Sequence, residues 1–176
     1  EMLRGDFGDD DARRRAAEAG SALTRFSRDS GIYRLQGSGH ANVYQLFLER
    51  ALGLVRRGGR IGFVLPSGFA GDHGCAHLRA HVLRSTTIDT LAIVENRDGL
   101  FPIHRALKFV LLTLSNAPIR SEATAFSLPL LPGLRTAADF DRLPDIGGDP
   151  REVPVSIRLI EQLSGDQLAI PELRTA

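Results

Sequence analysis

Apolar residues recur at helical spacing after Asn42 and then give way to an unbroken apolar run. Residues three or four positions apart form a broad apolar stripe, which predicts a helix that begins at Asn42 and ends at Gly58-Gly59. The run that follows, from Arg60 to Leu65, lacks polar alternation. Such runs are typical of strands that are buried on both faces within a parallel sheet covered by helices.

The alternation of helix and strand continues after Pro66. The same spacing rules predict a helix over 74–84 and a strand over 88–94, and this order is typical of an α/β fold. The residues between that strand and the next, 107–114, carry no helical periodicity. Because a parallel crossover of such length usually contains a helix, the last strand is predicted to return antiparallel.

Polar residues dominate both flanks of this α/β unit, which covers 36–116. Residues 1–35 predict a polar lead-in that is partly helical, with acidic residues ahead of a helix over 12–24. Prolines divide 117–176 into short pieces. That segment is predicted to be a connection towards another domain, with one short helix at about 155–163.

Composition places the chain among ordinary globular proteins. At 176 residues, with 43% hydrophobic and 24% charged residues, it can bury a core, and no apolar run is long enough to span a membrane. A single cysteine, Cys75, and the lack of a hydrophobic targeting segment predict a cytoplasmic location. The net charge of +1 does not by itself indicate a nucleic-acid partner. The chain begins at Glu1, so we expect a piece of a longer protein.

Polar side chains follow both of the first two predicted strands. Pro66-Ser67-Gly68 ends the first strand, and Glu95-Asn96-Arg97 ends the second. In open α/β sheets, ligands bind beyond the carboxyl ends of the strands. If the two strands run in parallel, Ser67 and Asn96 lie on the same edge, and the loop that carries Phe101 hangs over it. A polar floor with an exposed aromatic ring suits a planar heterocycle.

Four blocks of sequence, over 42–50, 58–68, 95–102 and 108–114, together resemble a known family. The resemblance is to the adenine-specific DNA methyltransferases of large restriction–modification proteins (type IIG-like, Eco57I-like), and residues 170–172 extend it. It implies the second half of a class I, Rossmann-like, S-adenosylmethionine-dependent methyltransferase fold. In that fold, parallel strands are closed by an antiparallel last strand, and a target-recognition domain lies downstream.

The resemblance also implies a mechanism. Such enzymes transfer a methyl group from S-adenosylmethionine to the exocyclic amine of adenine in double-stranded DNA, after the base has been flipped out of the duplex. In the family, an Asn-Pro-Pro-aromatic motif accepts the N–H bonds of that amine. A second aromatic residue stacks on the flipped base, and Phe101 matches it.

The resemblance assigns roles to two groups of residues. The flipped base would be bound by Phe101, Asn96 and Ser67. The DNA backbone would be met by Arg97, Arg105 and Lys108. Structural roles stay open for the same residues. Phe101 could be a hydrophobic residue that holds the loop against the sheet, and Asn96 could cap the loop by binding its backbone. The three cations could lie on the surface without binding a ligand.

Two motifs of the family are missing from the chain. No Asn-Pro-Pro-aromatic motif occurs, and no predicted strand is followed by the glycine-rich turn expected of the S-adenosylmethionine site. We therefore assign no catalytic residue and expect the fragment to be inactive alone. The rest of its own polypeptide, which would supply the upstream half of the catalytic domain, is an expected partner.

Other readings of the chain stay open. His73, His77 and His81 have the four-residue spacing of a helix, but without a matching carboxylate or cysteine they predict a polar face, so we expect no metal. The chain could also be a non-catalytic DNA-binding or specificity module. A third reading is a methyltransferase that acts on RNA, on protein or on a small molecule.

Overall fold

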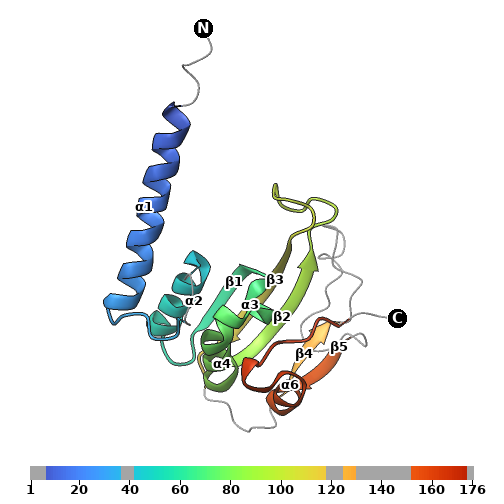
Figure 1. Ribbon diagram of the computed structural model, residues 1–176. Coiled ribbons are helices and arrows are strands. Elements are labelled where there is room, and N and C mark those ends of the chain that lie inside the picture. Colours follow the sequence, from blue (N-terminus) through green and yellow to red (C-terminus); the bar gives the residue numbers. More distant parts are fainter. Residues whose placement is uncertain (1–6, 37–41, 118–124, 130–151, 174–176) are drawn as a thin grey trace.

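The computed structural model describes residues 7–36, 42–117, 125–129 and 152–173 (Figure 1). Two small sheets and the helices around them make up this part of the chain. In chain order the elements are α1 (Phe7–Asp29), α2 (Val43–Leu54), β1 (Arg60–Pro66), α3 (Gly68–Gly71), η1 (His73–Cys75), α4 (Ala76–Ser85), β2 (Thr87–Glu95), β3 (Lys108–Ser115), β4 (Ala125–Pro129), β5 (Glu152–Ser156), α6 (Ile157–Ser164) and η2 (Gly165–Gln167).

The main sheet has the strand order β1–β3–β2, and both outer strands are antiparallel to β3. β1 and β2 therefore run in the same direction. Pro66 and Val94 both pair with Phe109, so the carboxyl ends of β1 and β2 flank the start of β3. The predicted antiparallel return of the last strand is confirmed. Neighbouring parallel strands do not occur among the described residues, because β3 occupies the position between β1 and β2.

Burial differs between the two outer strands. All residues from Leu91 to Glu95 in β2 are buried, as expected for a strand covered on both faces. β1 instead alternates, and its Val64 is 55% exposed. The prediction that β1 is buried on both faces is therefore wrong for the described part of the chain. Within that part, β1 has a neighbouring strand on one side only.

The predicted helices are present with shifted ends. α2 begins after Asn42, as predicted, but it ends at Leu54, and the turn that follows places Gly58 at a φ of +75°. α1 is longer at both ends than the predicted 12–24. The predicted helix over 74–84 consists of two elements, η1 and α4, and the short helix α3 before them was not predicted.

The long helix α1 extends away from the sheet, and α2 follows it (Figure 1). The buried carboxylate of Glu49 on α2 fixes the chain between them. It accepts hydrogen bonds from the backbone N–H groups of Arg34 and Leu35, at 2.5 and 3.0 Å, and from the side-chain amide of Gln36 at 2.5 Å. A buried carboxylate needs such donors to offset its lost hydration. None of the described helices is both long and apolar enough to cross a membrane.

The C-terminal elements share the core of the main sheet. β4 and β5 pair antiparallel, and β4 lies beside β2 (Figure 1). The predicted helix at about 155–163 is α6, whose first turn is capped by Ser156, the acceptor of a hydrogen bond from the N–H of Leu159 at 3.2 Å. Val155 and Ile160 are buried in the same apolar cluster as the main sheet. A connection towards a target-recognition domain stays a prediction for 117–176.

Arg79 on α4 is fully buried. Its guanidinium donates five hydrogen bonds, all to backbone carbonyl oxygens, namely those of Phe69, Asp72, Gln167 and Leu168. Burial lowers the pKa of this guanidinium. Buried carbonyl groups require donors, and Arg79 supplies them to two segments far apart in the sequence. It therefore joins the region around α3 to the chain after α6.

Substituting Arg79 with Met should lower the free energy of unfolding by roughly 3 kcal/mol, because several buried carbonyls would lose their donor at once. Urea denaturation measures this change. The control is Arg84→Met on the same helix, where the side chain is 57% exposed and paired with Glu161; it should change stability by about 0.5 kcal/mol or less. Equal effects of the two substitutions would contradict the role given to Arg79.

Candidate substrate-binding site

The carboxyl ends of β1 and β2 and the start of β3 form one edge of the main sheet. We call this edge, marked by Ser67, Asn96 and Lys108, the loop edge. The backbone N–H of Ser67 donates to the carbonyl of Lys108, and that of Asn96 donates to the carbonyl of Leu107, both at 3.1 Å. Ser67 and Asn96 therefore lie on either side of the first residues of β3, on one edge of the sheet.

The side chain of Asn96 organises the loop between β2 and β3. Asn96 is fully buried. Its Oδ1 accepts a hydrogen bond from the N–H of Phe101 at 2.9 Å, and its Nδ2 donates to the carbonyls of Phe101 and Ile103 at 3.1 and 3.2 Å. The turn inside the loop uses Gly99 at a φ of +76°. Of the two roles left open by the sequence, this geometry supports loop capping.

Phe101 is held at the loop edge with part of its ring exposed. Phe101 is 40% exposed, and its ring meets that of Phe109 edge to face, with the centroids 4.9 Å apart and an angle of 86° between the planes. Phe109 itself is buried in the core. Phe101 thus pins the loop to the sheet and also presents aromatic surface outward, so both readings of this residue fit the geometry.

Ser67 lies where β1 turns directly into α3. It occupies the N-cap position of that helix, and its carbonyl accepts a hydrogen bond from the N–H of Ala70 at 2.9 Å. Gly68 follows, and a Cβ at that position would lie 2.2 Å from Oδ2 of Asp72. The close approach of Asp72 favours glycine at position 68. Ser67 therefore shapes the turn at one end of the loop edge.

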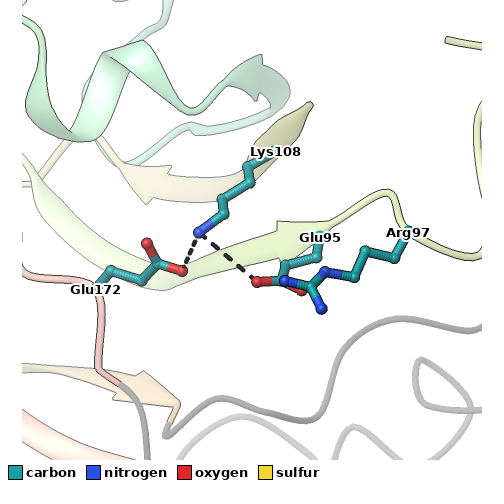
Figure 2. A network of polar contacts seen from close by, with 4 residues as sticks. All are labelled: Glu95, Arg97, Lys108 and Glu172. Atoms are coloured by element: carbon teal, nitrogen blue, oxygen red, sulfur yellow. Dashed lines mark hydrogen bonds and ion pairs between the residues drawn. The ribbon is translucent and has the colours of Figure 1, made fainter. Parts of the chain in front are cut away.

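Three basic residues near the loop edge were predicted to meet DNA phosphates, and two of them are paired with carboxylates. Nζ of Lys108 lies 2.5 Å from Oε1 of Glu172 and 3.7 Å from Oε1 of Glu95. Nε of Arg97 lies 2.8 Å from Oε2 of Glu95. Figure 2 shows Lys108 between the two carboxylates, with Arg97 beside Glu95. Arg105 is exposed, and its guanidinium lies over Gly99.

Sequence reasoning did not predict the role of Glu172. This residue is 64 positions from Lys108, and no local pattern joins two such distant residues. The one available signal was the weak continuation of the family resemblance over 170–172. Because Glu172 lies beside Lys108, the C-terminal segment must return to the loop edge.

A second polar cluster joins the first turn of α2 to η1. The buried thiol of Cys75 lies 3.0 Å from the hydroxyl of Tyr44 and accepts a hydrogen bond from Nε2 of Gln45 at 2.8 Å. Burial is the main cause that raises the pKa of Tyr44. Among the described residues no group of three or more His, Cys, Asp or Glu side chains could hold a metal ion.

Comparison with known proteins shows what part of this chain is similar to. Residues 22–101 match the model of the Eco57I restriction-modification methylase family. The match runs from α1 to Phe101 and includes the capping residue Asn96. The family resemblance found in the sequence is thereby confirmed over this range.

One relative and one solved structure add detail. The Type II methyltransferase M.BsuBI of Bacillus subtilis is 31% identical over 75 residues, which are 43% of this chain and 15% of the relative. The chain thus spans a small part of that relative's length. A chain from a study of complex assembly and conformational transition in the type I R-M system superimposes with a TM-score of 0.55 at 17% identity, covering 77% of this chain and 33% of that one. This likeness supports a mixed α/β fold.

Substituting Asn96 with Ala should speed amide hydrogen exchange at Phe101 about fivefold, because that N–H loses a buried acceptor whose hydrogen bond contributes about 1 kcal/mol net. Exchange followed by NMR measures the rate. Asn116→Ala is the control, because its side chain donates to the carbonyl of Val55 near the opposite end of β3. If Phe101 exchanged at the same rate in both variants, Asn96 would not be the cap of this loop.

Proposed function

We propose that this chain is the base-binding part of a site-specific DNA methyltransferase in a restriction–modification system. The reaction would transfer a methyl group to the exocyclic amine of adenine. One observation carries the proposal: Phe101 is held partly exposed at the loop edge, inside the stretch that matches the methylase family. Stacking of a base on an aromatic side chain contributes roughly 1–3 kcal/mol, enough to hold a flipped base in place.

Asn96 and Ser67 support Phe101 in different ways in this proposal. Asn96 fixes the backbone of the aromatic loop through three hydrogen bonds, so that the ring needs no reorganisation when the base arrives. Ser67 borders the same edge from the end of β1 and would face the base across β3. Both would act by orienting the base, and neither would exchange a proton with it.

The proposal includes a class I, Rossmann-like methyltransferase fold for the full catalytic domain. The reversed strand β3, which lies between two strands of common direction, fits the end of such a sheet. Further parallel strands would then continue the sheet beyond β1. Two exposed apolar side chains support this continuation, Val64 on β1 at 55% and Phe47 on α2 at 64% exposure, because a further strand beside β1 would cover apolar surface of this kind.

S-adenosylmethionine would supply the methyl group. The chain lacks the glycine-rich turn and the Asn-Pro-Pro-aromatic motif of such sites, so its residues do not fit the donor. We assign donor binding and amine activation to a preceding half of the same polypeptide. The residues described above bind and orient the base, and no step through the donor is derived from them.

Double-stranded DNA is the proposed substrate, and a target-recognition domain downstream is a proposed partner. Arg105 is the strongest candidate for a phosphate contact, because it is exposed and lies over the turn of the aromatic loop. Arg97 is also exposed, although it is paired with Glu95. Lys108 is more strongly engaged by carboxylates than either. A cytoplasmic location, where the DNA lies, belongs to the same proposal.

Methyl transfer from labelled S-adenosylmethionine to duplex DNA tests the function. The assay uses the full polypeptide that contains this chain, and labelled N6-methyladenine is expected in the digested product. Label on cytosine would refute adenine specificity. A full polypeptide that labels only RNA, protein or a small molecule, or that binds DNA without any transfer, would refute the proposed reaction. The isolated fragment is expected to transfer no methyl group.

Substituting Phe101 with Ala in the full polypeptide should lower kcat/KM for duplex DNA by about 5-fold to 150-fold, the equivalent of one lost stacking contact of roughly 1–3 kcal/mol. Steady-state methylation kinetics measure the change, and Phe101→Tyr should retain most activity. The control is Ile103→Ala, since Ile103 is 47% exposed in the same loop. Losses of equal size at both positions would argue against base stacking by Phe101.

A further inference from the structure

The chain after α6 returns to the main sheet and is held there at several points. Arg79 donates to the carbonyls of Gln167 and Leu168. The N–H of Ile170 then donates to the carbonyl of Ala70 in α3 at 2.8 Å. Leu168 and Ile170 are both buried. These contacts fix the direction in which the chain continues towards Glu172.

Leu168 adds an unusual backbone conformation to this segment. Its φ is +48°, and no other non-glycine residue among the described ranges has a positive φ. A leucine in the left-handed region costs on the order of 1 kcal/mol, and it persists only where the surroundings determine the conformation. Arg79 and the buried side chain of Leu168 itself provide that constraint. The turn at Leu168 is therefore a fixed feature that aims the following residues at the loop edge.

Glu172 reaches Lys108 as a result. Their side chains are only 28% and 25% exposed, and the carboxylate of Glu95, the second partner of Lys108, is 12% exposed. Partly buried charges are screened less by water and salt than exposed ones. The contact between Glu172 and Lys108 is thus stronger than that of an ordinary surface pair.

The neighbours of these charged residues connect the network to the aromatic loop. Glu95 immediately precedes Asn96, which caps the loop, and Lys108 immediately precedes Phe109, which packs against Phe101. The ammonium group of Lys108 therefore links the last residue of β2 to the first residue of β3, at the point where the loop leaves the sheet (Figure 2). Without Glu172, this ammonium would lose its nearer carboxylate.

We propose that Glu172 is a positioning residue of the base-binding site. It holds the ammonium of Lys108 against the two strand ends, and through them it fixes Asn96 and the ring of Phe101. The proposal rests on the proposed function for its effect on methylation. Glu172 touches neither the base nor the donor in this scheme.

Steady-state methylation kinetics of Glu172→Gln and Glu161→Gln in the full polypeptide test the proposal. Each substitution removes one carboxylate charge at nearly constant shape, and each disrupts an ion pair of the C-terminal region. Glu161 pairs with Arg84 at 2.9 Å, between α6 and α4. Glu172→Gln should lower kcat/KM about threefold to tenfold through kcat, the equivalent of about 1 kcal/mol, and Glu161→Gln should leave it unchanged.

DNA affinity separates positioning from a general loss of structure. Glu172→Gln removes a negative charge from the edge that would face phosphates, so the Kd for duplex DNA should stay equal or become smaller. A fall in kcat/KM that followed a larger Kd, or a melting temperature below that of Glu161→Gln by enough to unfold the protein at assay temperature, would overturn the proposal. An unchanged kcat would overturn it as well.

A double-mutant cycle tests the route through Lys108. If Glu172 acts through that residue, Glu172→Gln should have no further effect on kcat in a Lys108→Gln background. If the two residues act independently, the free-energy effects of the two substitutions on kcat should add. Hydrogen exchange at the amides of Asn96 and Phe101 provides a readout that needs no activity. Faster exchange in Glu172→Gln but not in Glu161→Gln supports positioning even if no methyl transfer is detected. Unchanged exchange refutes positioning, whatever reaction the protein performs.

Discussion

The placement of β3 between two strands of common direction is the constraint on which the rest of the structure depends. Both carboxyl ends are thereby brought to the start of one reversed strand, where Ser67 and Asn96 each donate a backbone hydrogen bond. The connection from β2 must then be a hairpin loop, and that loop has to emerge beside the end of β1. A single topological choice thus creates both the polar edge and the aromatic residue that overhangs it.

Two side chains fix the backbone around this edge by hydrogen bonding. Both the oxygen and the nitrogen of the Asn96 amide bind backbone atoms of the loop, and the guanidinium of Arg79 donates hydrogen bonds to backbone carbonyl groups. Buried amide and guanidinium groups are costly unless every hydrogen bond is made, so each one selects a narrow set of backbone positions. The precision of the loop edge therefore comes from polar side chains that bind backbone atoms.

Local patterns in the sequence predicted what depends on neighbours along the chain. The apolar pattern predicted α2 and the three strands of the main sheet. The short linker between β2 and β3 predicted the reversed direction of β3, and the order of motifs indicated Phe101. What escaped prediction depends on distant residues: Arg79 looks like an ordinary helix surface arginine, and Glu172 pairs with Lys108 across 64 positions. The same limit explains the exposure of β1. An apolar run shows that a strand can be buried, but it does not show which distant segment covers it.

The edge position of β1 within the described part of the chain has a consequence for how this part of the protein behaves on its own. There β1 pairs with a strand on one side only, and such an edge strand with an exposed Val64 is a template for pairing with another copy, which is the first step of aggregation. Natural sheets usually protect such edges with charge, proline or a bulge, and from Ile61 to Leu65 β1 carries no charge and no proline. For the isolated chain, resistance to aggregation therefore matters as much as the stability of the fold.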